Sequence, residues 1–359
     1  MKRVLVIHSG CVPHYRVPVY SYLEGYLKEY GFELRVVSDA IQEGDCGKPG
    51  TWFQKMCLST LSIARFVSAH KVDIVVDFMG LRDPFLFSTY FIVKGLLGRK
   101  MIYWGQGRDL LHKNAKLKNA AYRFEQSMAD AIILYAEHLA KYVNPRHRGK
   151  VFVANNTLLI DYRGLSPEKT RRGVLEEHGI HTRKNIICVG RMQHRKRIGN
   201  LVEAFALLKR PDIGLILVGP DPDGVLKGIT CQNIFKLGPV YGKEKLDLLS
   251  SSDVYCLPGA IGLSIVDAFH CGLPFITEEG DESAESMYLK DGLNGFIVER
   301  GDTLAMSRKL RLLLDDDELR RQFSAAAKEE IARNGTIDGF CRGFHNALSY
   351  VAEVRDPVR

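Results

Sequence analysis

The sequence offers little that would place it among disulfide-stabilised or membrane-spanning proteins. Its eight cysteines are scattered over 359 residues, and no two of them form a C-x-x-C pair. The start of the chain shows no signal-peptide pattern of charged, apolar and small residues. We therefore expect reduced cysteines in the core of a cytoplasmic protein.

Long apolar runs and metal-ligand patterns are also missing. The longest mostly apolar stretch, Pro84 to Gly98, is interrupted by Lys94 and falls short of the roughly 20 residues that cross a bilayer. The histidines outside the candidate acceptor segment (His70, His138, His178, His270 and His345) form no pair at metal-ligand spacing, and no G-x-x-x-x-G-K-[ST] phosphate loop occurs. We expect no membrane span, no metal site and no bound cofactor.

The positive charge is confined to the first half of the chain. Residues 1–160 carry 22 Lys+Arg and 13 Asp+Glu, or +9, and residues 161–359 carry 28 and 29, or −1. A basic half suits nucleic acid, an acidic lipid surface or a phosphorylated substrate, and composition does not choose among these. No nucleic-acid-binding motif accompanies the charge, so nucleic acid is the least favoured partner.

Apolar β-branched runs alternate with segments of helical spacing along the whole chain, beginning with "RVLVIHSG". This alternation predicts an α/β fold with doubly wound parallel sheets. The pattern breaks at "DYRGLSPEKT" (161–170), which we interpret as a linker. We expect one domain over 1–160, a second over 161–340 with two closing helices, and a C-terminal helix over 341–359 that packs back toward the first domain.

The second half opens with a candidate phosphate site, "CVGRMQHRKRIGNLVEAF". A strand, a turn at Gly190, Arg191, a basic loop with Lys196 and a helix start follow one another. Backbone amides at the helix start and two cations would bind a phosphate group. The alternative is a solvated basic loop before an amphipathic helix.

A second candidate site lies in "YCLPGAIGLSIVDAFHCGLPFIT". Amides of Gly262, Leu263 and Ser264 could bind phosphate oxygens, and Asp267 one turn later could accept both hydroxyls of a ribose. Asp267 could instead be an acid that stabilises a helix N-terminus.

Taken together, these segments resemble the family 4 glycosyltransferases over nearly the whole chain. The matching segments are "GRMQHRKR" for G-R-x-x-x-x-K, "LGPVY", "GLSIVDAFHCGLPFIT" for G-L-x-x-x-E-A-x-x-x-G-x-P-V-I, and "ESMYLKDGLNGFIVERGD". The resemblance implies the GT-B architecture, in which two Rossmann-like domains face a central cleft, the first taking the acceptor and the second the nucleotide sugar. It also implies a retaining transfer of a hexose from a nucleoside-diphosphate sugar, with UDP favoured over GDP, to a saccharide or lipid-linked saccharide.

The resemblance assigns roles to individual residues. Arg191 and Lys196 would hold the diphosphate, the backbone of Val240 would contact the base, Asp267 would bind the ribose, and Gly10 would let the chain approach the donor. Two positions depart from the family pattern. Gly259 replaces the first acid of the E-x7-E pair, and Gln106 stands at a frequent histidine position.

The acceptor side is expected in the first half. "PHYRVP" places His14, Tyr15 and Arg16 before a helix and resembles a P-x-Y-R-x-P segment of the family. In the alternative interpretation, Tyr15 and Arg16 only cap and pack that helix. Gln106 and Arg108, and with less weight Arg82 and Asp83, follow other predicted strands.

The apolar segment from Phe85 to Leu97 and the basic segment "HKNAKLKNAAYR" from His112 suit peripheral contact of the first half with a membrane. Their alternative is a buried crossover helix and a solvated helix face. Two alternatives to the transferase remain, a nucleotide-sugar epimerase or hydrolase of the same architecture and a non-catalytic nucleotide-sugar-binding subunit.

Overall fold

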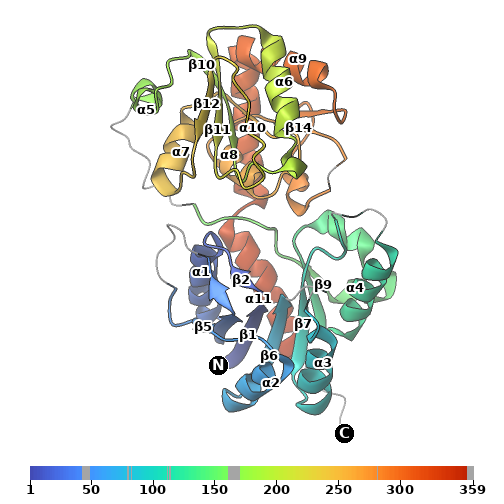
Figure 1. Cartoon of the computed structure of the whole chain (residues 1–359). Coiled ribbons are helices and arrows are strands. Elements are labelled where there is room, and N and C mark those ends of the chain that lie inside the picture. The colour runs from blue at the N-terminus through green and yellow to red at the C-terminus, as the bar shows by residue number, and fades with distance from the viewer. Residues whose placement is uncertain are drawn as a thin grey trace. The chain divides into compact units, whose positions relative to one another are not determined.

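The computed structural model describes residues 1–42, 49–78, 81, 83–110, 112, 115–160, 170–280 and 282–353. Its contacts divide the chain into two compact units (Figure 1). Unit 1 comprises Met1–Leu159 and Thr336–Arg359, and unit 2 comprises Ile160–Gly335. Residues 161–169 of the predicted linker (161–170) and Arg82 lie outside the described residues.

Unit 1 is built on a seven-stranded parallel sheet. In spatial order its strands are β5 (Phe53–Lys55), β3 (Phe32–Ser38), β1 (Lys2–His8), β6 (Ile74–Phe78), β7 (Lys100–Gly105), β8 (Ala131–Leu134) and β9 (Val151–Val153). The central strands are near-continuous apolar runs because helices cover both faces of such a sheet. Two short strands, β2 (Cys11–Val12) and β4 (Ala40–Ile41), pair separately.

The helices of unit 1 include one from the far end of the chain. They are α1 (Arg16–Glu29), α2 (Thr60–Ala69), α3 (Leu86–Tyr90), which continues into a π-helical segment (Phe91–Leu96), α4 (Lys116–Met128) and α11 (Ile337–Glu353). Helix α11 packs on β8, β9 and α1. Its Phe344 ring lies 4.7 Å from the ring of the fully buried Trp104 in β7, so the last helix completes the core of the first domain.

Unit 2 has a six-stranded parallel sheet. Its spatial order is β12 (Ile234–Leu237), β11 (Ile213–Val218), β10 (Lys184–Val189), β13 (Val254–Cys256), β14 (Phe275–Glu278) and β15 (Gly295–Val298). Its helices are α5 (Arg171–Glu177), α6 (Ile198–Leu208), α7 (Gly242–Ser250), α8 (Ser264–His270), α9 (Thr303–Asp315) and α10 (Asp317–Asn334).

Helices α9 and α10 follow the last strand of unit 2, and α11 follows them. Asp316 separates the first two, because its side chain accepts a hydrogen bond from the Leu319 N–H at 2.8 Å and starts a new helix. Helix α11 begins at Ile337, four residues before the expected boundary at 341. Among the described residues, no helix is long and apolar enough to cross a membrane.

Candidate functional site

The strand order of unit 2 reverses beside β10. From β10 the chain continues to β11 on one side, whereas β13 lies on the other side. In open parallel sheets, ligands bind at the carboxyl ends of the strands at such a reversal. The loops that leave these two ends are residues 190–197 and 257–263, and they are the two segments that the sequence predicts as phosphate-binding.

These two loops contact each other directly. The Gly259 N–H donates to the Lys196 carbonyl at 3.0 Å, and the Lys196 ammonium donates to the Ala260 carbonyl. The structure thus brings Lys196 to the loop that leads to Gly262, Leu263 and Ser264. Arg191 is exposed, and within the described residues no hydrogen bond or ion pair holds its guanidinium.

Gly190 and Gly219, which follow β10 and β11, lie close to each other. A Cβ at Gly219 would lie 2.1 Å from the Gly190 carbonyl oxygen, so the ends of β10 and β11 approach too closely for a side chain. Val240 follows β12 at the same edge of the sheet and is partly exposed. No described hydrogen bond or ring contact links Val240 to the two loops, so its proposed contact with the base stays a prediction.

Helix α8 begins directly after the second loop. No side chain caps its N-terminus at Leu263, and Ser264 Oγ donates to the Ile261 carbonyl at 2.7 Å. The Val266 and Asp267 N–H groups donate to the Leu263 carbonyl at 3.0 and 3.4 Å. The amides expected to bind phosphate are those ahead of them, at Gly262, Leu263 and Ser264.

Asp267 in α8 has a partner that the sequence did not predict. Both of its carboxylate oxygens accept hydrogen bonds from the Lys245 ammonium of α7, at 2.8 and 2.9 Å. Asp267 is buried, with 8% of the residue exposed, and its carboxylate is paired with this ammonium group. The spacing of 22 residues between these two positions carries no local pattern that could have revealed the pair.

A second cation–carboxylate pair also went unpredicted. Arg197 Nε donates to Glu278 Oε2 at 2.7 Å, and its Nη2 donates to the Pro258 carbonyl at 2.6 Å. Asn200 of α6 donates to the other oxygen of Glu278 at 2.7 Å. Arg197 has a left-handed backbone with φ of 51°, and this network holds it next to Lys196.

The missing acid at position 259 has a steric explanation. A Cβ on Gly259 would lie 2.1 Å from the Arg195 carbonyl oxygen and 2.6 Å from the Lys196 Cα. Both neighbours are backbone atoms, so any side chain at this position would displace the Lys196 loop. Glu278 is the nearby acid, and it is fully engaged with Arg197 and Asn200.

In unit 1, Gly10, predicted to lie near the donor, and the predicted acceptor residues follow β1 and β7 at the carboxyl edge. Gly10 is exposed with φ of 72°, and its carbonyl accepts from Ser38 Oγ at 2.6 Å. Tyr15 is 40% exposed, and its ring packs edge-on against His14 at 5.6 Å between centroids. These residues remain accessible to a ligand.

Arg16 is not at the surface, contrary to its expected place at the mouth of a cleft. It is 4% exposed, and its guanidinium donates to Asn156 Oδ1 and lies over the rings of Trp104 and Tyr135. The aromatic ends of β7 and β8 bury its planar cation through cation–π contacts.

Gln106 and Arg108 surround a glycine turn after β7. Gln106 is partly exposed, and the neighbouring Gly107 carbonyl accepts from Gln126 Nε2 at 2.7 Å. The Arg108 guanidinium lies 4.6 Å from the centre of the Tyr142 ring. Arg108 is therefore held against the Tyr142 ring. Asp83, the other described candidate after a strand, lies just before α3 and is partly exposed.

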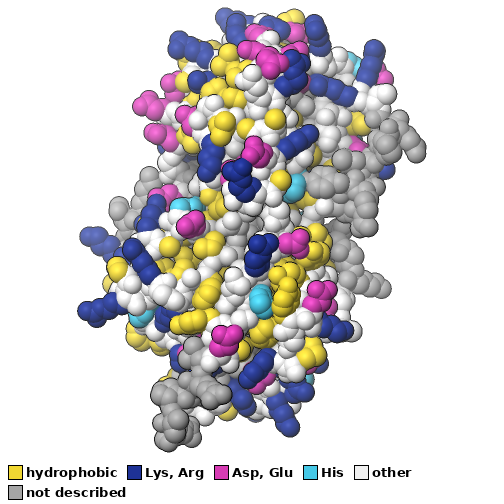
Figure 2. Space-filling view, turned by 180° about the vertical axis from the view of Figure 1, so that it is seen from behind, with side chains coloured by type: hydrophobic (Ala, Val, Ile, Leu, Met, Phe, Trp, Pro, Cys, Tyr) yellow, Lys and Arg dark blue, Asp and Glu magenta, His cyan; other side chains and the backbone are white. Residues whose placement is uncertain are grey.

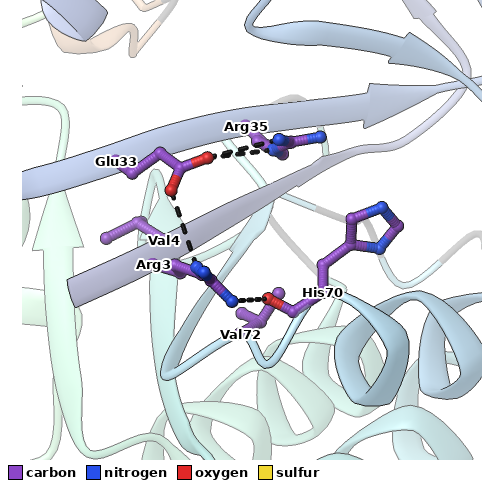
Figure 3. Close-up of a pocket in the computed structure, with 6 residues that line it drawn as sticks. All are labelled: Arg3, Val4, Glu33, Arg35, His70 and Val72. Carbon is purple, nitrogen blue, oxygen red and sulfur yellow. Dashed lines mark hydrogen bonds and ion pairs between the residues drawn. The ribbon is translucent and has the colours of Figure 1, made fainter. Parts of the chain in front are cut away.

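One pocket of unit 1 lies elsewhere and is excluded as a substrate site. It is at the amino edge of the sheet and is lined by Arg3, Val4, Glu33, Arg35, His70 and Val72 (Figure 3). Glu33 pairs with both Arg3 and Arg35, at 3.6 and 3.3 Å. The volume of ≈ 10 Å³ is about that of one water site.

Unit 2 is similar to a known protein family. Residues 174–330 match the family model described as Glycosyl transferases group 1. A phosphatidyl-myo-inositol mannosyltransferase of Mycobacterium leprae is 31% identical over 160 residues, covering 42% of this chain and 42% of that protein. An N-acetyl-alpha-D-glucosaminyl L-malate synthase of Bacillus anthracis is 29% identical, covering 44% and 43%. These alignments span less than half the length of the curated relatives.

Solved structures match over nearly the entire chain. A glycosyltransferase from Rickettsia africae superposes with a TM-score of 0.77 at 17% identity over 99% of both chains. The Anabaena protein HepE in complex with UDP gives a TM-score of 0.75 at 13% identity over 97% of this chain and 100% of that one. The chain has the GT-B fold, with two Rossmann-like domains.

Proposed function

We propose that this protein is a glycosyltransferase that takes a nucleoside-diphosphate sugar in unit 2 and transfers its hexose to a hydroxyl group of an acceptor bound by unit 1. The observation that carries the proposal is the junction of the two loops at the β10/β13 reversal, where Lys196 contacts the loop before α8. The match of residues 174–330 to Glycosyl transferases group 1 supports it.

In the proposed reaction, the bond between the sugar C1 and the diphosphate oxygen breaks, and a bond from C1 to the acceptor oxygen forms on the same face. The acceptor proton passes to the departing diphosphate oxygen, so no strong protein base is required. Gln106 can orient a hydroxyl group but takes up no proton at neutral pH. Arg191, Lys196 and the first amides of α8 stabilise the charge that develops on the diphosphate, without a metal ion.

We propose UDP as the nucleotide of the donor. HepE, whose fold is similar, has been crystallised with UDP and with UDP-glucose. Asp267 would accept the ribose hydroxyls, and the backbone near Val240 would contact the base. A thermal-shift panel of nucleoside diphosphates tests this choice, because a ligand at about 100 times its Kd adds about 2.7 kcal/mol of stability.

The proposed acceptor is a saccharide or a lipid-linked saccharide, and a surface of unit 1 suits contact with an anionic membrane on the cytoplasmic side. The exposed apolar side chains on α3, the π-helical segment and α4 are Phe87, Phe91, Leu96, Leu117 and Phe124. The rings of Phe87 and Phe124 lie 5.6 Å apart, so these elements form one apolar surface.

Exposed cations accompany this apolar surface. Lys116 and Arg123 are exposed on the same helix, α4. On the face drawn in Figure 2, hydrophobic side chains of unit 1 lie among Lys and Arg side chains. Such a combination binds anionic lipid surfaces. Sedimentation with anionic vesicles should be lost in Phe91→Glu and kept in Leu312→Glu, which alters an exposed apolar residue of unit 2.

Product analysis tests the transferase against its alternatives. Incubation of the protein with UDP-sugars should yield a glycosylated acceptor only when an acceptor is present. An epimerised or hydrolysed nucleotide sugar formed equally well without acceptor would contradict the proposal. Binding of UDP with no turnover over a broad acceptor panel would instead indicate a nucleotide-sugar-binding subunit.

A further inference from the structure

Among the residues that the structure describes, Arg16 is a buried cation without an anionic partner. Its residue is 4% exposed, and its Nη1 nitrogen is buried with no hydrogen-bond partner. The other terminal nitrogen, Nη2, donates to the neutral amide of Asn156. Over the described ranges, no carboxylate forms an ion pair with Arg16.

The surroundings of Arg16 supply hydrogen-bond donors but no compensating charge. The guanidinium carbon lies 5.5 Å from the centre of the Trp104 ring and 5.7 Å from that of Tyr135. The indole N–H of Trp104 is also buried without a partner. Burial and the nearby Arg16 charge lower the pKa of His8 to about 3, so this histidine is neutral. Both unsatisfied groups are donors, and a ligand that satisfies them must provide acceptors.

Leaving a charge buried and unpaired is strongly unfavourable for a folded protein. Cation–π contacts offset part of that cost, but they leave Nη1 unsatisfied. A binding site explains why the cation is retained, since an anion that enters it regains the missing interaction.

The place of Arg16 in the fold is that of a ligand site. Arg16 follows the β1 loop, Trp104 lies near the end of β7, Tyr135 follows β8, and Asn156 follows β9. All four therefore lie at the carboxyl edge of the sheet, where open α/β sheets bind ligands. The accessible Gly10 and Tyr15 belong to the same β1–α1 loop.

We propose that Arg16 binds an anionic oxygen group, a phosphate or a carboxylate, of the molecule that unit 1 takes up. The acceptor is then an anionic compound rather than a neutral sugar. Naming that molecule the acceptor rests on the proposed function, whereas the anion site itself does not.

Thermal unfolding of the full chain in phosphate, acetate and chloride at matched ionic strength tests the site. Arg16→Met keeps an unbranched side chain against Trp104 and removes the charge, and a buried cation replaced by an apolar group costs little stability. We expect its midpoint in chloride to equal or exceed that of the wild type. Its apparent affinity for inorganic phosphate or acetate should fall about tenfold or more.

Further variants show which residue is responsible for the response to phosphate and acetate. Arg3→Met removes a half-exposed arginine from the opposite edge of the same sheet and should respond to the anions as the wild type does. Lys196→Ala tests whether phosphate acts at the donor loop. Arg16→Lys keeps the charge without the planar fork and should give a weakened but measurable response, which covers the case in which Arg16→Met does not fold.

Several results would overturn the inference. If Arg16→Met responds to both anions like the wild type, or loses stability equally in chloride and in phosphate, Arg16 is a structural residue. If only Lys196→Ala loses the response, phosphate binds the donor loop, and the proposed function stands without this inference. A response that depends on Arg16 in a protein that binds no nucleoside diphosphate would support the anion site and contradict the proposed function. Comparison of the phosphate and acetate arms distinguishes the two kinds of anionic group.

Discussion

Lys245 donates hydrogen bonds to both carboxylate oxygens of Asp267, at 2.8 and 2.9 Å. The acid predicted to bind ribose is therefore already paired with an ammonium group from another helix. A nucleotide that binds there would share the carboxylate with Lys245 rather than meet an isolated negative charge. In the proposed donor complex, this pairing would offset repulsion between Asp267 and the diphosphate of the donor.

Asp267→Ala should weaken binding of UDP and of UDP-sugars by similar factors. The ribose loses charge-assisted hydrogen bonds worth about 1.5 to 3 kcal/mol, and Lys245 loses its partner. Isothermal titration measures both affinities. Lys243→Ala, an exposed change on the same helix α7, is the control and should bind as the wild type does. Unchanged affinity for UDP in Asp267→Ala would remove Asp267 from the donor site.

Lys196→Ala and Arg191→Ala should each slow transfer by two to three orders of magnitude. Loss of one donor to a transition-state oxyanion costs about 2.7 to 4 kcal/mol, and the diphosphate is the corresponding group here. Steady-state rates with saturating acceptor give the effect. Arg195→Ala, an exposed cation of the same loop, should retain most of the activity. Equal losses in all three variants would indicate general disruption of the loop.

Gly259→Ala should impair donor binding through the backbone. The new methyl group would lie 2.1 Å from the Arg195 carbonyl oxygen, so the Lys196 loop must shift. We expect a lower unfolding midpoint together with weaker UDP binding. Gly25→Ala, on helix α1 of unit 1, adds a methyl group with no described atom beyond its own stretch of helix within 4 Å and should leave UDP binding unchanged. If Gly259→Ala binds UDP as tightly as the wild type, the close contact between the loops does not matter for the donor.

Stability should fall as the pH rises because of one buried acid in unit 1. Burial raises the pKa of Glu125 to about 10, and the neighbouring Asp77 contributes to the rise. The folded state then holds a proton that the unfolded chain releases above its usual pKa of 4.5, so stability is lost progressively between these two values.

Glu125→Gln removes this titration while keeping the shape of the side chain. Chemical denaturation between pH 5 and pH 9 should show a smaller loss of unfolding free energy in this variant than in the wild type, with the pH values chosen as roughly the ends of the sensitive range. Glu137→Gln, an exposed change in unit 1, should follow the wild type. Parallel curves for Glu125→Gln and the wild type would show that Glu125 does not hold the proton.

Local sequence patterns predicted the alternation of strands and helices and the two candidate phosphate-binding loops. "IGNLVEAFALL" coincides with helix α6 because its apolar residues recur at helical spacing. Parallel strands also bring their carboxyl ends to one edge, so the association of the 190–197 and 257–263 segments followed from the expected fold.

Long-range partners remained hidden for a physical reason. Lys245 with Asp267, and Arg197 with Glu278, join residues on different elements, 22 and 81 positions apart. Nothing in local spacing favours one such pair over the other charges nearby. The burial of Arg16 likewise depends on Trp104, Tyr135 and Asn156, which come together only when β7, β8 and β9 stand side by side.

The central claim is that the loops at the β10/β13 reversal bind a nucleoside diphosphate. Isothermal titration of UDP into the full-length wild type and into Lys196→Ala, both with excess chelator, tests it most directly. We predict saturable binding of about one UDP per chain to the wild type without divalent metal, and affinity at least about tenfold weaker in Lys196→Ala, as expected for loss of a charge-assisted contact. If the wild type binds no UDP, or if both proteins bind UDP with equal affinity, these two loops are not the nucleoside-diphosphate site.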